Sequence, residues 1–361
     1  MNDFVQATVR HGTGHITLDR PPALNSLTLD MVRTLTTTLS GWAADPRVAA
    51  VVVDSSTTRA FCAGGDIRFL HDAGRANPQG GSALLEDFFT EEYSLNHLIH
   101  HYPKPYIALM DGVVMGGGMG IAQAGPANRV RIVTERTKMA MPEVNIGLFP
   151  DVGGSYFLPR ASGKTGLYLA LTGLTIGAAD ALRAGLADLF VPSTRLDALR
   201  ALIAATAGAQ LRAAIEAFAA PLRDAAGPAP LASHASDIAR HFGAASVAAI
   251  VQSLGEDDHA FAAKARAAMA LRSPLMMSAT FELLRRGATL GLADCLRLER
   301  ALVRRVFEHG EVVEGVRALV VDKDNAPRWS PPVLADVTDQ MVAGLFEPVW
   351  PAHAHPLRGL L

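Results

Sequence analysis

The chain has 361 residues, of which 49% are hydrophobic and only 19% are charged, so its composition excludes an intrinsically disordered protein. A formal net charge of −2 provides no positive field for nucleic acid or an anionic membrane, and any anionic ligand must be held by local groups. The two cysteines cannot build a disulfide framework, and no Cys/His spacing matches a zinc site, so we expect no metal and a reducing compartment.

The sequence also predicts no membrane partner. Arg, Asp, Gly or Pro interrupts every apolar run before it reaches the ~20 residues that a spanning helix needs. The N-terminus, Met1-Asn2-Asp3-Phe4, lacks the pattern of a signal peptide and carries an acid where transit peptides avoid one. We therefore expect a cytoplasmic protein.

The first half of the chain alternates strand-like and helix-like segments. Residues 15–18 predict a short strand, and Thr28 can cap a helix that ends before Asp45. A β-branched run at residues 48–53 predicts a strand buried on both faces, and residues 106–110 and 130–133 repeat this pattern. Strands that recur between helices predict an α/β fold with βαβ crossovers.

The second half differs in composition. Residues 196–220 are rich in alanine and predict helix, and residues 224–236, rich in Pro, Gly and Ala, are the best candidate for a linker. Apolar residues recur at helical spacing from Leu292 to Val306, which predicts a C-terminal region of helices packed on an α/β core. We expect irregular structure after Arg328.

Glycine clusters lie where the predicted strands end, at residues 64–65, 116–118 and 153–154. Ligands bind at such strand-to-helix junctions, and two backbone N–H groups that converge there form an oxyanion hole, in which one donor contributes about 3–4 kcal/mol. The alternative is that each cluster is only a tight turn. Residues 162–165 resemble the end of a phosphate-binding loop, but Leu158 stands where its leading glycine would be.

Two acids follow on loops with apolar neighbours, Glu143 after Met141-Pro142 and Asp151 after Phe149-Pro150. Apolar surroundings and a neighbouring like charge raise the pKa of a carboxyl group, which provides a base and an acid at neutral pH. Each acid alone is equally consistent with a helix cap or a solvated loop residue.

In this order the motifs resemble the crotonase (enoyl-CoA hydratase/isomerase) superfamily. They are Phe61-Cys62-Ala63-Gly64-Gly65-Asp66, Met115-Gly116-Gly117-Gly118, Met141-Pro142-Glu143 and Phe149-Pro150-Asp151-Val152-Gly153-Gly154. The resemblance covers residues 16–191 and resumes at 310–329. It implies an α/β fold, a crotonase-like spiral of ββα units with a C-terminal helical region. The acyl-CoA-binding and catalytic core would span residues 1–195, and a helical extension packed on it would span residues 196–361.

The resemblance also implies an acyl-CoA substrate whose coenzyme A is part of the substrate, so that no separate cofactor is expected. The two oxyanion donors carry over to Gly65 and Gly117. Residues Ala63, Asp66 and Ile67 carry over to the wall that holds coenzyme A. A thioester carbonyl between the two N–H groups gains negative charge on its oxygen, whether an enolate or a tetrahedral intermediate forms.

Within the superfamily, the positions of the acidic residues distinguish one enzymatic activity from another. Hydratases use two glutamates, but here Gly120 stands at the first position and only Glu143 is present at the second. Asp151 stands where hydratases usually have glycine. These residues, with Glu92 in Glu91-Glu92-Tyr93, resemble the branch that hydrolyses 3-hydroxyisobutyryl-CoA to 3-hydroxyisobutyrate and CoA in valine degradation.

In that branch, the resemblance implies that Glu143 activates water or attacks the thioester carbonyl itself. Asp151 would bind the 3-hydroxyl group or assist proton transfer to the departing thiolate, and Glu92 would contact the substrate. Glu92 could equally be an acid on a helix surface. Ser155 stands where this branch commonly has glycine. The resemblance therefore supports the type of reaction more strongly than it supports the identity of the acyl group.

Two other functions remain open from the sequence. One is an enoyl-CoA hydratase or isomerase that uses Asp151 as its second acid, and the other is an acyl-CoA-binding protein without activity, against which the retained acids argue. Glu299, on an otherwise apolar helical stripe, is either a satisfied buried acid or the edge of that stripe. Arg317 and Lys323 could reach the phosphates of CoA or be exposed. We expect a homo-oligomer of few copies.

Overall fold

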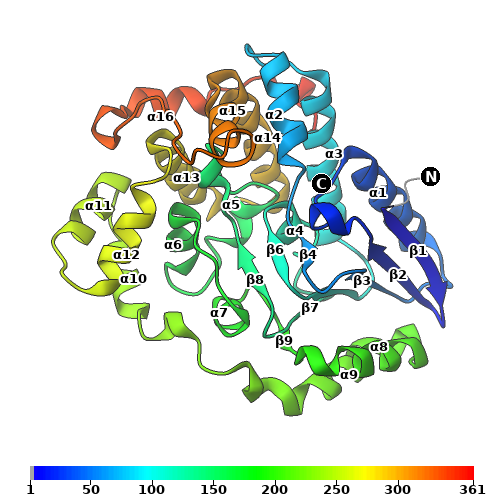
Figure 1. The fold of residues 1–361 in the computed structure, drawn as a ribbon. Helices are drawn as coiled ribbons and strands as arrows, with labels where there is room; N and C mark the ends of the chain where they lie inside the picture. The colour runs from blue at the N-terminus through cyan, green and yellow to red at the C-terminus, as the bar shows by residue number, and fades with distance from the viewer. Residues whose placement is uncertain (1–3) are drawn as a thin grey trace. The chain divides into compact units, whose positions relative to one another are not determined.

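A computed structural model describes residues 4–361, which form two compact units (Figure 1). Unit 1 contains the described residues up to Gly65, Ser94–Ala140 and Ile176–Ala232, and unit 2 contains Asp66–Tyr93, Met141–Thr175 and Ser233–Leu361. Each unit takes segments from both sides of residue 195, while the expected division there into core and extension stays a prediction. Met1, Asn2 and Asp3, on which the N-terminal prediction rests, lie outside the described residues.

Unit 1 contains two sheets. The six-stranded sheet has the order β1 (Val5–Arg10), β2 (Thr13–Leu18), β3 (Ala50–Ser55), β5 (Tyr106–Met110), β7 (Arg129–Val133) and β9 (Leu189–Phe190). Its β1 is antiparallel to β2, and all its other pairs are parallel. The three-stranded parallel sheet has the order β4 (Ala60–Cys62), β6 (Val113–Met115) and β8 (Lys138–Ala140).

Consecutive strands alternate between the two sheets. The pairs β3–β4, β5–β6 and β7–β8 each give their first strand to the larger sheet and their second to the smaller one, and a helical segment follows each pair. This is the expected ββα repetition, and the predicted α/β fold is confirmed. The three runs predicted to form buried strands are β3, β5 and β7, whose side chains are buried as expected.

Helices of unit 1 pack on the larger sheet. The helix α1 (Leu29–Ala44) begins where Thr28 accepts a hydrogen bond from the N–H of Met31 at 3.2 Å, as expected of a cap. Helices α8 (Leu196–Ala205) and α9 (Gly208–Ala219) lie beside β9 (Figure 1) and bury Leu199, Ile203, Leu211 and Ile215 against the strands. The remaining helical segments are η1 (Pro21–Ala23), α4 (Gly117–Gly120), α7 (Ala178–Ala184), η3 (Ser193–Arg195), η4 (Ala220–Ala226) and η5 (Pro230–Ala232).

Unit 2 is helical. Its first stretches hold α2 (Ile67–Ala76), most of α3 (Ala83–His100), η2 (Glu143–Ile146), α5 (Gly154–Phe157) and α6 (Thr165–Thr172). Its last stretch holds α10 (Ala235–His241), α11 (Val247–Gly255), α12 (Ala260–Met269), α13 (Pro274–Gly287), α14 (Leu292–His309), α15 (Glu311–Val316), η6 (Arg317–Val321), η7 (Leu334–Asp336), α16 (Asp339–Leu345) and η8 (Ala352–Ala354). No helix within residues 4–361 is long and apolar enough to cross a membrane.

The predictions for the linker and for the C-terminal tail have different outcomes. The expected linker over residues 224–236 contains the step from unit 1 to unit 2, after Ala232. The expectation of irregular structure throughout the tail is wrong at α16, because Thr338 caps a helix there by accepting from the N–H of Met341 at 3.2 Å.

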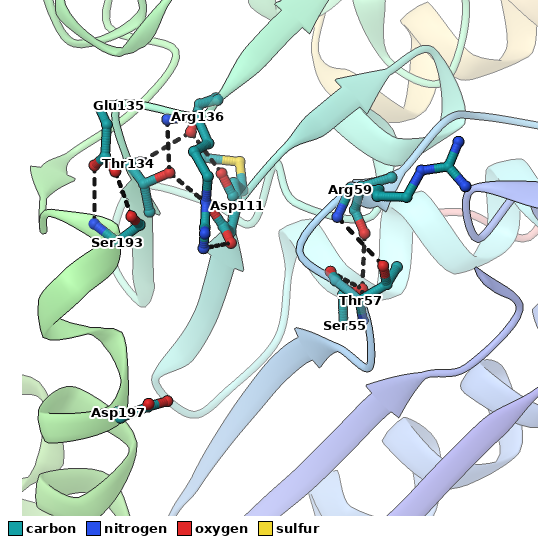
Figure 2. A network of polar contacts seen from close by, with 12 residues as sticks. Ser55, Thr57, Arg59, Asp111, Thr134, Glu135, Arg136, Ser193 and Asp197 are labelled. Carbon is teal, nitrogen blue, oxygen red and sulfur yellow. Dashed lines mark hydrogen bonds and ion pairs between the residues drawn. The ribbon is translucent and has the colours of Figure 1, made fainter.

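A polar network in unit 1 fixes the corner between β5 and β6 (Figure 2). The carboxylate of Asp111 accepts hydrogen bonds from the hydroxyl of Thr134 at 2.6 Å and from Nε of Arg136 at 3.0 Å. The hydroxyl of Thr137 donates to the carbonyl of Met110 at 2.7 Å. These bonds hold the start of β6, the strand that leads into the second glycine loop.

Candidate active site

The two predicted glycine loops lie against each other in unit 1. Gly64 has a φ of +101°, and a Cβ atom there would lie 3.1 Å from the carbonyl of Met115 and 3.3 Å from the nitrogen of Gly117. Gly116 also has a positive φ, at +51°, and precedes the first turn of α4. Only glycine adopts this backbone path freely, and the first N–H groups of a helix have no acceptor within it. The structure thus brings together the loops that carry Gly65 and Gly117.

The residues predicted to hold coenzyme A lie around the first loop. The N–H of Ala63 donates to the carbonyl of Leu24 at 3.0 Å, which ties the loop to the preceding segment. Asp66 caps α2, its carboxylate accepting from the N–H of Phe69 at 3.3 Å, and Ile67 is the first residue of that helix. Asp66 therefore has a structural role, and contact of these residues with coenzyme A stays a prediction.

The three predicted acids form a buried cluster in unit 2. Glu92 lies on α3, Glu143 begins η2, and Asp151 lies in the loop before α5. Only 2%, 6% and 5% of these residues is exposed, respectively, so the alternative of solvated acids is wrong. The hydroxyl of Tyr93 donates to Oδ2 of Asp151 at 2.7 Å.

Burial gives all three acids an increased affinity for protons. Burial, followed by the charge of Asp151, raises the pKa of Glu92 and that of Glu143 well above the usual value. Burial also raises the pKa of Asp151, to about 6, against the opposing effect of the hydrogen bond from Tyr93. The buried cluster therefore favours the protonated form of all three acids, and among them only Asp151 has a pKa placed near 6.

Two oxygen atoms of this cluster are buried without partners. Among residues 4–361, nothing donates a hydrogen bond to Oε1 of Glu92 or to Oε2 of Glu143. An unpaired buried polar group costs about 1–3 kcal/mol, and native proteins rarely leave one without a ligand, a water or a function. These two oxygens are the atoms available to a substrate or to an attacking water.

Sequence reasoning missed Tyr93 as a partner of Asp151. The tyrosine is fully buried on α3, next to Glu92, and burial followed by the charge of Asp151 raises its pKa well above 10. The motif Glu91-Glu92-Tyr93 was the available indication, since adjacent helical residues can both face one cluster. A contact between residues 58 positions apart is not contained in the local pattern.

Glu299 is a satisfied buried acid, one of the two alternatives left by the sequence. It is 0% exposed on α14, and its carboxyl group accepts from the N–H of Gly153 at 2.8 Å, the N–H of Ser155 at 3.0 Å and the hydroxyl of Ser155 at 2.5 Å. Ser155, the departure from the expected glycine, thus has a partner.

Other candidate residues have structural partners. Cys62 is buried in β4, with its sulfur 3.1 Å from the carbonyl of Asn25, as expected of a core residue. Arg317 pairs with Glu314, Asp322 and Asp324, at 2.8, 2.6 and 2.7 Å. Its guanidinium is therefore engaged by three acids, which disfavours a role at the phosphates of CoA.

The folded repeats and the buried acids agree with a comparison to known families. A family profile described as Enoyl-CoA hydratase/isomerase matches residues 13–346. The chain belongs to this family. The match covers both glycine loops and all three acids of the cluster.

Individual members of this family are similar over most of their length. The chain is 41% identical over 341 residues to a protein of Xenopus tropicalis named "3-hydroxyisobutyryl-CoA hydrolase, mitochondrial", which covers 92% of this chain and 86% of the relative. It is 38% identical over 339 residues to the human protein of the same name, covering 93% of this chain and 86% of the relative.

Two solved structures are also similar to this chain in sequence and in fold. One, described as a carnitinyl-CoA dehydratase from Mycobacterium thermoresistibile, has a TM-score of 0.87 and 40% identity over 97% of this chain and 98% of its own. The other, described as an enoyl-CoA hydratase from Rhodobacter sphaeroides 2.4.1, has a TM-score of 0.84 and 40% identity over 96% of this chain and 98% of its own. The crotonase fold is therefore shown for the chain.

Proposed function

We propose that the protein hydrolyses a short-chain β-hydroxyacyl-CoA thioester, 3-hydroxyisobutyryl-CoA, to 3-hydroxyisobutyrate and CoA. The observation that carries this proposal is the buried cluster of Glu92, Glu143 and Asp151, with unpaired oxygens on two of the three. The names of the relatives at about 40% identity support the same substrate.

In this reaction the N–H groups of Gly65 and Gly117 stabilise the negative charge that develops on the thioester oxygen. The contact between their loops in unit 1 supports this assignment. One such donor contributes about 3–4 kcal/mol to the transition state. The reaction needs no cofactor beyond the coenzyme A of the substrate.

Glu143 brings about the attack of an oxygen atom on the thioester carbonyl carbon in one of two ways. Its unpaired Oε2 takes a proton from water, which attacks the carbonyl, or it attacks the carbonyl and forms a mixed anhydride that water then opens. A single turnover in ¹⁸O-labelled water reveals the anhydride route if label appears in Glu143. The first route puts ¹⁸O into the product alone, whereas water that opens the anhydride at the glutamyl carbon leaves ¹⁸O in Glu143.

Asp151 and Glu92 serve the rest of the substrate. With a pKa near 6, Asp151 is mostly ionised at neutral pH, so its carboxylate is suited to accept a hydrogen bond from the 3-hydroxyl group or to relay a proton to the departing thiolate. Burial raises the pKa of Glu92 and so favours its protonated form, whose carboxyl group can exchange hydrogen bonds with that hydroxyl. Both roles use side chains that are already held in the buried cluster.

A second candidate is the hydratase or isomerase reaction, favoured by the descriptions of the two solved structures at 40% identity. Gly120 argues against the hydratase reaction, because a hydratase of this family would carry one of its two glutamates at that position. The decisive assay measures free thiol and double-bond absorbance with 3-hydroxyisobutyryl-CoA and crotonyl-CoA. Thiol release from the first supports the hydrolase. Hydration of the second with no free CoA overturns it, and tight binding without turnover of either indicates a binding protein.

We also propose a cytoplasmic location and a role in valine degradation. Curated relatives carry "mitochondrial" in their names, so the location needs its own test by fractionation of the source cells. Deletion of the gene should stop growth on valine as the carbon source and cause 3-hydroxyisobutyryl-CoA to accumulate. Whether the protein forms an oligomer stays a prediction for sedimentation measurements.

A further inference from the structure

One buried acid of unit 2 has no part in the proposed reaction. The carboxyl group of Glu299 lies on α14 and receives three hydrogen bonds, all from the turn that follows Asp151. A helix loses nothing by carrying an apolar residue at a fully buried position, and apart from Arg300, which pairs with Glu86 on α3, the other buried side chains of this helix are apolar. We therefore attribute the presence of Glu299 at this position to its hydrogen bonds with the turn after Asp151.

The turn that Glu299 holds has an unusual backbone. Val152 has a φ of +51°, which a β-branched residue rarely adopts, and Gly153 follows with a φ of +88°. The N–H of Gly154 donates to the carbonyl of Asp151 at 2.6 Å, which closes the turn directly on Asp151. Such a backbone persists only where its surroundings hold it, and the contacts to Glu299 begin two residues after Asp151.

We propose that Glu299 is a positioning residue, whose carboxyl group holds the 152–155 turn and thereby sets the place and the protonation of the Asp151 carboxyl group. This inference rests on the proposed function for its effect on the rate, but not for its effect on Asp151. Tyr93 holds the same carboxyl group from α3, so Asp151 is fixed both through its side chain and through its backbone.

The ionisable groups around Glu299 are Asp151, Tyr93 on α3, Glu143 in η2 and Cys295 on its own helix. From α13, Gly287 packs on the carbonyl of Ser155 and has no side chain. Burial raises the pKa of Glu299 to about 8, while the hydrogen bonds from Ser155 and Gly153 lower it. Above pH 8 a further negative charge thus enters the buried cluster.

This arrangement has a kinetic consequence. As the pH rises through about 8, Glu299 ionises and its charge opposes the negative charge already on Asp151, so kcat should fall. Glu299→Gln removes this step from the pH profile. It also leaves one N–H donor of the turn facing an amide NH₂, so kcat should fall roughly tenfold with KM changed less than about threefold.

The matched control is Asp180→Asn in unit 1. Asp180 is also a buried helical acid whose carboxylate accepts from a backbone N–H, that of Leu231, at 2.8 Å, and burial also raises its pKa. This variant should leave kcat and its pH profile unchanged. A folded Glu299→Gln protein with the kcat and the pH profile of the wild type would overturn the proposal.

A second measurement does not depend on turnover. In protein with ¹³C-labelled aspartate, the carboxyl signal missing from Asp151→Asn belongs to Asp151. In the wild type this signal should move near pH 6 and again near pH 8, and the second movement should be absent from Glu299→Gln. A wild type without the second movement, or a variant that retains it, contradicts the inference even if the protein proves not to be a hydrolase.

Ser155→Ala tests the same link with a smaller change. It removes only the hydroxyl that donates to Glu299 and leaves both backbone hydrogen bonds in place. Loss of this donor should raise the pKa of Glu299 further, so the upper limb of the pH profile should move to higher pH with the same plateau. An unmoved limb contradicts the assignment of that limb to Glu299.

Discussion

The buried acids in unit 2 would serve the proposed reaction at the expense of stability. Glu143 keeps one oxygen unpaired in an apolar setting, which costs free energy in the folded state and makes that oxygen available for chemistry. Tyr93 has the opposite effect on Asp151, because its hydroxyl satisfies one carboxylate oxygen and lowers the pKa. The proton affinity of each acid thus depends on its partners more than on its type.

Glu143→Gln should lower the rate and raise the stability. Loss of the group that activates or attacks should reduce kcat by about 10²–10⁴-fold. The pKa of Glu143 is raised from 4.5 in the folded state, so the wild type loses stability as the pH rises from 4.5 through the folded pKa, and Gln does not titrate. Urea unfolding at several pH values should therefore show a stability gain for the variant that grows above pH 4.5, and a gain independent of pH would contradict it.

Tyr93→Phe should move the acid limb of the pH profile. The hydrogen bond from Tyr93 lowers the pKa of Asp151, so its removal should raise that pKa above about 6 and shift the limb to higher pH. Tyr102→Phe is the control, since this buried tyrosine donates at 3.0 Å to the carbonyl of Leu39, away from the acids. Equal profiles for the two variants would show that Tyr93 does not act on Asp151.

At the scale of elements, glycines decide how closely α4 approaches β4. A Cβ atom at Gly118 would lie 2.1 Å from the carbonyl of Cys62, so the helix that carries Gly117 packs directly on the strand before the first loop. This close approach brings the two glycine loops together. Gly41, within α1, has no such role, because a Cβ atom there would meet nothing within 4 Å.

Two alanine substitutions should therefore have opposite effects. Gly118→Ala should force α4 away from β4 and destabilise the protein by about 1–3 kcal/mol or more, with loss of activity. Gly41→Ala should stabilise it by about 0.5–1 kcal/mol, since alanine restricts the unfolded chain and favours helix. Thermal unfolding of both variants is the measurement, and a neutral Gly118→Ala would exclude the close approach.

The sequence predicted the elements that follow from local pattern and missed those that depend on distant partners. Strands β3, β5 and β7 have five or six residues each and are rich in apolar side chains, whereas β4, β6 and β8 have three residues each and no period to detect. The buried acids were predicted by their motifs. The hydrogen bonds from the Ser155 region to Glu299 join residues 144 positions apart, which only the folded chain reveals.

At the scale of the whole molecule, the exposed stretch from Ala220 to Ala232 ends unit 1 and leads into unit 2. Its two 3-10 segments contain no buried residue, so we expect this stretch to open more readily than the buried sheet of unit 1. The predicted linker therefore coincides with the passage between the units.

Limited proteolysis tests this passage. Trypsin should cut first after Arg223, which is exposed within η4, and yield a fragment that begins at Asp224. Mass spectrometry identifies the cut, and Arg223→Gln should delay it several-fold. First cleavage at another site in both proteins would show that the stretch is not the weakest part of the chain.

The interleaving of the two units imposes an order on folding during synthesis. Glu92, Glu143 and Asp151 leave the ribosome in the first half of the chain, but Glu299, which holds the turn after Asp151, follows only with α14 (Leu292–His309). The nascent chain therefore exposes its acidic segments, and the apolar surfaces around them, until most of the protein has been made. Unit 2 can therefore complete its packing only when translation is nearly finished, since its last helices come from the end of the chain.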